Sequence, residues 1–494
     1  MREHAASWYK CGIVLIHAAA RNTHPMNVNK LAHQIHDVRM ALPGIHICDE
    51  PEVRVSHGQD WTRFKTPAPL AVAFPANPAE VQDIVRFACA CGLALVPSGG
   101  RTGLSGGAVA ADGELVVSFD RMRRILEFDP IDRTVTVEAG VVTAAVQSFA
   151  RERNLYYPVS FAAEGSSQLG GNLATNAGGI RVLRYGLTRD WVTGLSVVTG
   201  TGELLECNRG LVKNASGYDF RHLFIGSEGT LGMIVEATLE LTDPPPPGKV
   251  MLLGISGLDA LMQVFALLRE NLKLSAFEFL TDRAMRHVRN GHRLPAPLAN
   301  ECPLYVVTEF DCPTAIEEGL AMDCFTQGME NGWLLDGVLS QSDRQNGELW
   351  RYREGISESI TRYRPYKNDL SVRISRVPVF LEKMDLLMQE ICPDYEAVWY
   401  GHIGDGNLHM NIIGPAGPDT PDFAARCHEI SEQTYALTQS LGGSISAEHG
   451  IGVLKQPWLD MTRSAGEISA MQGIKRVFDP AGIMNPGKLL SRPS

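Results

Sequence analysis

The sequence of 494 residues lacks the features that mark several specialised classes of protein. It has no apolar run near the length of about 18 residues that a membrane-spanning helix needs, no tandem repeat and no low-complexity tract. Basic residues form no continuous stripe, because 45 Lys and Arg are spread among 56 Asp and Glu, giving a net charge of −11. Phosphate backbones are bound by clustered positive charge, so nucleic acid is excluded as a partner.

A cysteine framework is also missing. The ten cysteines are scattered and include no CxxC pair, which predicts reduced, mostly buried thiols and a cytoplasmic protein. The N-terminal segment WYKCGIVLIHAAARN has too short an apolar core for a secretion signal, and His17 interrupts it. We therefore expect residues 1–30 to form a poorly ordered leader.

The pattern along the rest of the chain predicts two α+β domains, because 494 residues exceed the reach of one core. Residues 31–243 alternate helix and strand signals, beginning with a helix over 75–92 and a strand over 93–100 that runs into a glycine loop. The segment DPPPPGK, residues 243–249, predicts a stiff extended connector and the main domain boundary. A second domain is expected over 244–450, followed by a C-terminal segment, 451–494, that packs back onto the first domain.

Three glycine-rich segments in the first domain predict a bound ligand. PSGGRTGLSGGAV, residues 97–109, contains five glycines, and such a loop presents backbone N–H groups that suit a pyrophosphate. It matches neither the Walker loop nor the GxGxxG fingerprint, and taken alone it is also compatible with a flexible loop that binds nothing. GSSQLGGNLATNAGGIRVLRYG (165–186) and GSEGTLG (226–232) follow. Each glycine forfeits roughly 0.5 to 1 kcal/mol relative to alanine, which a ligand would offset.

The stretch WYGHIGDGNLHMNI, residues 399–412, predicts a hairpin. A two-residue turn at residues 405–406 would place His402 directly opposite His409, close enough for both imidazoles to bind one metal ion. The alternative is a half-buried hairpin whose histidines bond to the backbone, and a third ligand has to decide between the two. The side chains expected on the histidine face are His402, His409 and Asn411, and those on the opposite face are Leu408, Met410 and Ile412.

The order of these motifs is specific. PSGGRTGLSGG, GGNLATNAGG, GSEGTLG, the polyproline link, GHIGDGNLH, SAEHGIG and NPGKLL together resemble the FAD-linked 2-hydroxyacid dehydrogenases of the vanillyl-alcohol oxidase fold. The resemblance covers about residues 50–490 and is strongest to the bacterial D-2-hydroxyglutarate dehydrogenases. It implies an α+β fold, with a two-lobed PCMH-type FAD-binding domain and an α+β substrate domain, or cap, that contains an antiparallel sheet. The residues that the resemblance implies around the FAD are Ser98, Gly99, Gly100, Arg101, Thr102, Gly103, Ser105, Gly165, Ser166, Gly170, Gly171, Asn172, Thr175, Asn176, Gly178, Gly179, Gly229, Ile234 and Asn485.

The segment SAEHGIG, residues 446–452, supplies the third ligand. Glu448 with His402 and His409 makes two imidazoles and a carboxylate, the set typical of a catalytic zinc with an open coordination position, and the resemblance implies the same role. Zinc is the first choice, with manganese or cobalt as alternatives. His449 is expected to diverge from the metal and to act as general base, with an unperturbed pKa of about 6.5. Taken alone, the Glu-His pair is also compatible with a surface turn.

Substrate binding is inferred from the same resemblance. Arg353, Ser357 and Lys367 fall where these dehydrogenases bind a carboxylate, although serine replaces the expected threonine and the lysine spacing is approximate. Asn411 is a further expected substrate contact. The expected reaction is oxidation of D-2-hydroxyglutarate to 2-oxoglutarate, with His449 taking the hydroxyl proton while hydride passes from C2 to flavin N5.

Several alternatives stay open. D-lactate, glycolate or another D-2-hydroxy acid could be the substrate; a non-redox FAD transferase that builds ether lipids shares the fold; and a non-catalytic flavin-binding module would leave the two histidines and the glutamate unexplained. The electron acceptor is expected to be an electron-transfer flavoprotein, a quinone or oxygen, and relatives suggest a homodimer.

The flavin is predicted to be non-covalent, because covalent attachment in this fold usually uses a histidine or cysteine near the glycine loops and none lies between Cys91 and Cys207. Denaturing the protein should release free FAD into the supernatant. A yellow precipitate under a colourless supernatant would contradict the prediction.

Overall fold

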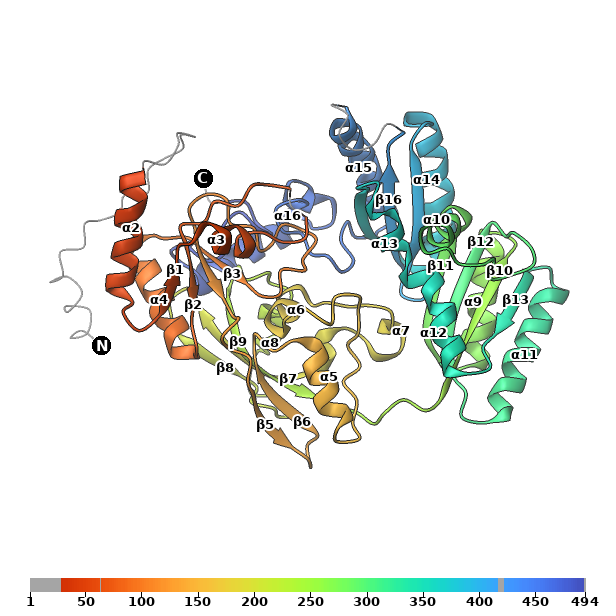
Figure 1. Cartoon of the computed structure of the whole chain (residues 1–494), viewed down its shortest axis with the longest axis horizontal. Coiled ribbons are helices and arrows are strands. Elements are labelled where there is room, and N and C mark those ends of the chain that lie inside the picture. The colour runs from red at the N-terminus through yellow and green to blue at the C-terminus, as the bar shows by residue number, and fades with distance from the viewer. Residues whose placement is uncertain (1–27, 63, 416–421, 493–494) are drawn as a thin grey trace.

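The computed structural model describes residues 28–62, 64–415 and 422–492 (Figure 1). The expected leader lies outside these residues except for its last three, which begin helix α2 (Val28–Ala41). Three sheets organise the chain, two of them in the part before the polyproline link and the third after it. None of the described helices is long and apolar enough to cross a membrane.

The first lobe is built on a four-stranded sheet. In spatial order its strands are β1 (His46–Cys48), β2 (Ala71–Phe74), β4 (Leu115–Ser118) and β3 (Leu95–Ser98), of which only β1 is antiparallel to its neighbour. Helices α3 (Pro51–His57) and α4 (Pro78–Cys91) accompany it. The helix expected over 75–92 is present as α4 and begins at Pro78, because the side chain of Asn77 accepts the N–H of Glu80 at 3.0 Å and caps it. Strand β3 leads directly into the first glycine segment.

The second lobe is a five-stranded antiparallel sheet with short helices. In spatial order its strands are β5 (Ile125–Asp129), β6 (Thr134–Glu138), β9 (Gly232–Glu240), β7 (Val192–Thr199) and β8 (Leu204–Cys207). The helices are α5 (Thr143–Arg151), α6 (Leu169–Thr175), α7 (Val182–Tyr185) and α8 (Arg221–Phe224), with a 3-10 turn η1 (Thr188–Trp191). The second glycine segment contains α6 and α7, with Gly170 and Gly171 inside α6 and Gly178 and Gly179 between the two helices.

Residues 243–247 form neither helix nor strand, as the prolines predict, and we call the part of the chain from β10 onward the second domain. Its seven-stranded antiparallel sheet has the spatial order β13 (Leu334–Leu339), β10 (Gly248–Ile255), β12 (Leu304–Asp311), β11 (Leu274–Thr281), β15 (Glu396–Gly401), β16 (Asn407–Ile413) and β14 (Tyr366–Ser371). One face packs against α9 (Leu258–Asn271), α11 (Ala315–Glu330), α14 (Val377–Ile391) and α15 (Phe423–Ser440). The other face packs against α10 (Asp282–His292), α12 (Asp343–Glu354) and α13 (Ile356–Thr361). The predicted fold class, two lobes and an α+β domain with an antiparallel sheet, is confirmed.

The C-terminal residues return to the first lobe (Figure 1). After the turn η3 (Gln456–Met461) and helix α16 (Ala465–Phe478), the N–H of Leu95 in β3 donates to the carbonyl of Ile483 at 2.8 Å, and the N–H of Asn485 donates to the carbonyl of Leu95 at the same distance. Ile483 and Met484 join the core of the first lobe. The chain between α15 and η3, which contains SAEHGIG, therefore crosses from the second domain to the first.

A second connection between the domains lies at α7, which packs against β11. Arg181 forms a two-pronged ion pair with Glu309 on β12, with both N–O distances at 3.3 Å, and Arg184 pairs with Asp311. Glu309 also accepts hydrogen bonds from Ser275 and Trp350 at 2.8 and 3.0 Å. These contacts fix how the second glycine segment meets the second domain.

Candidate active site

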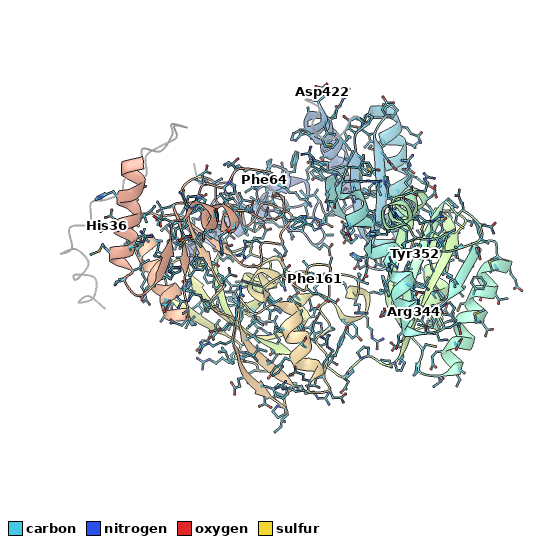
Figure 2. All side chains as sticks on the ribbon, viewed as in Figure 1. His36, Phe64, Phe161, Arg344, Tyr352 and Asp422 are labelled. Carbon is cyan, nitrogen blue, oxygen red and sulfur yellow. The ribbon has the colours of Figure 1, made fainter. Side chains whose placement is uncertain are left out.

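A cavity of about 700 Å³ lies between the two domains. Phe161, one of its lining residues, marks the boundary on the side of the first domain (Figure 2). Loops of the first domain, strands β15, β16 and β14 of the second, and the crossing segment 446–452 all contribute to the wall. The expected cofactor, substrate, metal and base residues therefore meet in one place.

Most of the expected residues line this cavity. They are Gly99, Gly100, Arg101, Thr102, Gly103, Ser105, Gly170, Gly171, Asn172, Thr175, Gly178, Gly179, Gly229, Ile234, Arg353, Ser357, Lys367, His402, His409, Asn411, Glu448, His449 and Asn485. Segments up to 386 residues apart in the chain are brought together here, from Gly99 to Asn485. No cysteine is among the described lining residues.

Four expected residues do not reach the cavity wall: Ser98, Gly165, Ser166 and Asn176. Ser98 is buried, and its hydroxyl donates to the carbonyl of His57 at 3.1 Å. Asn176 accepts the N–H of Arg189 at 3.1 Å with its side-chain oxygen. The carbonyl of Ser166 lies where a Cβ on Gly100 would collide with it, at 2.3 Å, so this residue supports the first glycine loop from behind.

The first-domain half of the cavity fits a large polar ligand such as FAD. The side-chain oxygens of Gln168 and Asn485 are buried without a hydrogen-bond partner, and both residues line the cavity. Buried acceptors normally have a donor, so a ligand is expected to provide one. A Cβ built on Gly171 would meet nothing within 4 Å, which shows that this glycine leaves open space in the wall.

The hairpin differs from the expected one in its register. His409 lies opposite Tyr400 rather than His402, and the loop between the strands has five residues, 402–406. A two-residue turn of the expected type needs positive φ at both central residues, but only Gly406 has it, at 86°. Asp405 instead accepts the N–H of Asn407 with its side chain at 3.1 Å. Because the slip is two residues, the predicted faces survive, and Leu408, Met410 and Ile412 lie in the core behind the site.

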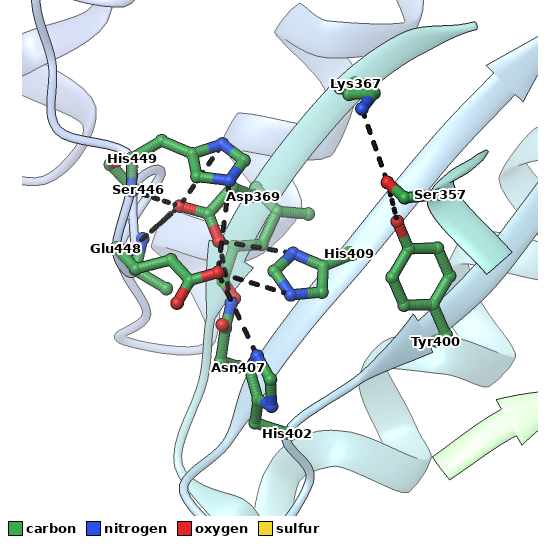
Figure 3. Close-up of polar contacts among 12 residues, drawn as sticks. Ser357, Lys367, Asp369, Tyr400, His402, Asn407, His409, Ser446, Glu448 and His449 are labelled. Carbon is green, nitrogen blue, oxygen red and sulfur yellow. Dashed lines mark hydrogen bonds and ion pairs between the residues drawn. The ribbon is translucent and has the colours of Figure 1, made fainter. Parts of the chain in front are cut away.

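Carboxylate and imidazole atoms gather where the hairpin meets the crossing segment (Figure 3). The Oε1 atom of Glu448 lies 3.5 Å from His409 Nε2 and 3.9 Å from His402 Nε2. Ligands bound at about 2.0 Å in a tetrahedral zinc site lie roughly 3.3 Å apart, so this spacing is slightly wider than a loaded site. The residues present fit a divalent cation.

A group of four residues with donor atoms all within 4.8 Å of one another consists of Asp369, His409, Glu448 and His449. It contains two of the three expected ligands, and His402 lies beside it, with Nε2 3.9 Å from Glu448 and its ring centroid 5.2 Å from that of His409. His449 Nε2 also lies 3.9 Å from Glu448 Oε1, so these two adjacent side chains do not diverge as expected. We assign Asp369 a supporting role, because its Oδ2 already accepts three backbone N–H groups from residues 447–449 at 2.9 to 3.0 Å.

Each of the two hairpin histidines has a carboxylate behind it. His402 Nδ1 lies 2.8 Å from Glu278, and His409 Nδ1 lies 3.6 Å from Asp369. A carboxylate at Nδ1 fixes the ring and leaves Nε2 free, which is how metal-binding histidines are commonly oriented in proteins. Both Nε2 atoms face Glu448.

The charges of the site follow from burial and close neighbours. Burial opposes the charged form of His402, but the Glu278 carboxylate outweighs it and raises the pKa of His402 to about 9. Burial raises the pKa of Glu448 to about 8 and lowers the pKa of His449 to about 4. His449 is therefore neutral at pH 7 and can accept a proton, but its pKa is not the unperturbed one expected. Burial lowers the pKa of His409, and burial at Asp369 is outweighed by neighbouring His449 and Lys455, so the pKa of Asp369 stays well below its ordinary value.

A second polar group lies on the same cavity wall. Lys367 Nζ lies 3.5 Å from the hydroxyl of Ser357, which lies 3.2 Å from the hydroxyl of Tyr400 (Figure 3). The guanidinium of Arg353 lies over the Tyr400 ring at 4.7 Å and bonds to Glu278 through Nε at 2.9 Å. Burial lowers the pKa of Lys367, and no salt bridge joins it to a carboxylate in the described part of the chain. Asn411 directly opposes Lys367 across β14 and β16, and its side-chain oxygen is buried without a partner.

Sequence reasoning missed the supporting carboxylates Glu278 and Asp369. Glu278 stands in LSAFEFLT, a strand whose side chains are buried up to the last residue, and an acidic residue in such a strand was a usable signal. Asp369 lies on β14, two residues after Lys367, in a segment for which only the basic residues were predicted to have a role. Tyr400 was placed on the hairpin but given no role.

Comparison with known proteins agrees with the geometry. Residues 69–208 match the FAD binding domain family, and residues 244–489 match FAD linked oxidases, C-terminal domain. The chain is 57% identical over 456 residues to D-2-hydroxyglutarate dehydrogenase of Xanthomonas citri pv. viticola, covering 92% of this chain and 96% of that protein. It is 50% identical to D-2-hydroxyglutarate dehydrogenase of Stutzerimonas stutzeri, covering 91% and 97%.

Solved structures show the same fold at low identity. p-Cresol methylhydroxylase with substrate bound superposes with a TM-score of 0.74 at 13% identity, covering 94% of this chain and 98% of that one. Alkyldihydroxyacetonephosphate synthase superposes with a TM-score of 0.68 at 15% identity, covering 94% and 86%. These likenesses support the fold only.

The two family matches and these relatives make the chain an FAD-linked oxidoreductase. Within that class, the identities of 50% and 57% over nine-tenths of the chain show that it belongs to the D-2-hydroxyglutarate dehydrogenase family.

The carboxylate behind His402 generates a testable prediction. Glu278→Gln should weaken zinc binding by about 10-fold to 100-fold, because the amide oxygen is a weaker acceptor than a carboxylate for the Nδ1–H of the neutral imidazole and orients the ring less firmly. Competition with a chelator of known affinity measures the change. Glu354→Gln is the matched control, since Glu354 lines the same cavity and bonds to neither hairpin histidine. Equal zinc affinity in both variants would contradict the role of Glu278.

Proposed function

We propose that the protein oxidises D-2-hydroxyglutarate to 2-oxoglutarate, with non-covalent FAD on the glycine segments and a divalent cation, zinc by first choice, at His402, His409 and Glu448. The electrons then pass to an external acceptor. The bacterial relatives at 50% and 57% identity are named for this activity, which supports the substrate. The observation that carries the proposal is the second cationic group, Arg353 and Lys367, on the wall beside the metal residues.

That group suits the distal carboxylate of a five-carbon dicarboxylic acid. Lys367 and Asp369 are two residues apart on β14, a separation of roughly 6.6 Å along a strand. Their neighbours across the ladder, Asn411 and His409, are separated in the same way. A carboxylate near Lys367 and a hydroxy acid group near His409 can therefore belong to one molecule. A lactate methyl would leave the buried ammonium of Lys367 without a counter-ion.

The cofactors would supply two kinds of chemistry. The glycine segments would hold FAD, which would serve as the acceptor of the electron pair from the substrate C2. His402, His409 and Glu448 would hold a divalent cation, which would acidify and orient the substrate hydroxyl.

The chain's own residues do the remaining work. His449 is neutral because burial depresses its pKa, so its free nitrogen can take the hydroxyl proton. Lys367, Ser357 and Arg353 hold the distal carboxylate, and Glu278 keeps Arg353 and His402 in fixed positions from one side. Asn411 lines the same cavity and has a side-chain oxygen without a hydrogen-bond partner, which suits a hydroxyl donor.

The fold is shared with a synthase, so a non-redox reaction has to be tested against the proposal. Anaerobic mixing with D-2-hydroxyglutarate should bleach the flavin absorbance, and D-lactate and D-malate should do so less efficiently. A chelator should slow the bleaching. Flavin that stays oxidised with all three acids would contradict the proposal and favour the transferase alternative.

His449 should be essential for turnover. His449→Asn removes the proton acceptor while preserving most of the volume of the side chain, so kcat should fall by about 10² to 10⁴. The flavin absorbance spectrum should stay that of the wild type, since the residue lies on the crossing segment and not on a glycine loop. Steady-state dye reduction measures the effect, and normal activity would remove His449 from the mechanism.

Lys367 should discriminate between substrates. Lys367→Met should lower kcat/KM for D-2-hydroxyglutarate by about 10-fold to 100-fold, because a charge-assisted hydrogen bond to the distal carboxylate is lost. The value for D-lactate should change little. Lys383→Met, on an exposed part of α14, controls for the loss of one positive charge. An equal loss for both acids would contradict the assignment of Lys367 to the distal carboxylate.

A further inference from the structure

The third glycine segment, GSEGTLG, contains a buried acidic residue that the proposed chemistry does not use. Glu228 is 8% exposed, and its backbone has the left-handed φ of 54°, a conformation that non-glycine residues seldom adopt. It belongs to the first domain and, like its neighbour Gly229, lines the cavity. A strained backbone and a buried charge in one residue are both costly, so some contact has to compensate for them.

The side chain of Glu228 reaches the segment that crosses between the domains. Its Oε1 accepts the N–H of Ile451 and its Oε2 accepts the N–H of Gly452, both at 2.7 Å. Burial raises the pKa of Glu228, and these two donors together with Lys455 favour the ionised form. Hydrogen bonds from backbone N–H groups to a carboxylate are short and strong, and a pair of them fixes both position and direction.

The other end of the same segment is bound by the second domain. Asp369 Oδ2 accepts the N–H groups of Ala447, Glu448 and His449. Two carboxylates from two domains therefore hold the backbone on either side of Gly450, and buried Lys455 lies close to both of them. Glu448 and His449 belong to the part of the segment that Asp369 holds, and only Gly450 separates them from the residues that Glu228 holds.

Glu228 is also bonded directly to the flavin side of the cavity. Its N–H donates to the carbonyl of Ala174 in α6 at 2.8 Å, and its own carbonyl accepts the side-chain amide of Asn485 at 2.7 Å. Ala174 and Asn485 both line the cavity. A short path of hydrogen bonds thus leads from the flavin-side wall, through one residue, to the segment with the proposed ligand and base.

We propose that Glu228 is a positioning residue: it fixes residues 451–452 to the first domain and thereby sets the positions of Glu448 and His449 relative to the flavin side of the cavity. Asp369 sets the same two residues relative to the hairpin histidines. The inference deepens the proposed function, because it rests on the roles given there to Glu448 and His449.

The test is Glu228→Gln. Glutamine has the same shape but one acceptor oxygen and an NH₂ group, so one of the two backbone N–H groups would face a donor. The first measurement is hydrogen exchange resolved to single amides in the FAD-loaded protein. The amides of Ile451 and Gly452 should exchange faster than in the wild type. Those of Val453 and Leu454, which donate to the carbonyl of Ser105, should keep their protection and serve as an internal reference.

The second measurement compares zinc affinity, kcat and KM. A displaced ligand and base should lower zinc affinity and kcat for D-2-hydroxyglutarate by about 10-fold to 100-fold, because small errors of position have effects of this size. KM should change less than 3-fold, roughly, since Arg353 and Lys367 belong to the other domain and bind the substrate in both states. FAD content and the visible flavin spectrum should match the wild type.

Arg184→Gln is the matched control. Arg184 pairs with Asp311 across the same pair of domains, but it lies outside the cavity lining and away from the crossing segment. It should lower thermal stability without changing the amides of residues 451–452, zinc affinity or kcat. Glu228→Asp, which keeps the charge and is better tolerated at positive φ, should show the same changes as Glu228→Gln in weaker form, and it replaces that variant if glutamine prevents folding.

The outcomes separate the inference from the proposed function. Unchanged exchange at residues 451–452, or faster exchange with wild-type kcat and zinc affinity, would overturn the inference and leave Glu228 as a stabilising residue only. A wild-type protein that oxidises D-2-hydroxyglutarate without binding zinc would refute the metal assignment, and kcat in the variants would still decide the inference. A wild-type protein inactive with D-2-hydroxyglutarate would refute the proposed function, whereas the exchange rates and zinc affinities would still support or overturn the positioning role.

Discussion

Backbone N–H groups buried away from water have to find acceptors, and residues 447–452 form neither helix nor strand that would supply them. Two carboxylates, Asp369 and Glu228, accept the hydrogen bonds instead, one from each domain. This solution has a structural consequence that regular structure would not have. The segment is free to follow the boundary between the domains, and its side chains project into the cavity at the point where substrate, metal and flavin would meet.

The two domains contribute different kinds of residues to the cavity. The first domain contributes glycine loops. Gly171 leaves open space in the wall, and the side-chain oxygen of Gln168 has no hydrogen-bond partner. The second contributes a rigid antiparallel sheet, whose strands hold His409, Lys367 and Asn411 at spacings fixed by the ladder. Loops suit a ligand that is bound largely through backbone groups. A pair of strands suits a small substrate whose two ends are bound at a fixed distance from each other.

The sequence predicted which residues line the cavity better than it predicted the geometry of the hairpin. Period-two alternation placed His409 and Asn411 on one face and Leu408 on the other, and this holds because a slip of two residues preserves the face. The register failed because turn type depends on φ at Asp405, which the dipeptide does not determine. Glu278 and Asp369 lie 124 and 40 residues before the histidines that they orient, so their roles emerge only when the strands pair. The pKa of His449 could not be predicted for the same reason, since burial sets it. The domain boundaries, the electron acceptor, the oligomeric state and the cellular compartment stay predictions.

The proposed mechanism depends on a divalent cation that the hairpin and the crossing segment bind together. The most direct measurement is anomalous diffraction from crystals of the active enzyme at energies above and below the zinc absorption edge. We expect one strong peak at about 2.0 to 2.2 Å from His402 Nε2, His409 Nε2 and a Glu448 oxygen, because these distances are ordinary zinc bond lengths. Fully active crystals with no anomalous peak at that position at the edge of any divalent transition metal would contradict it.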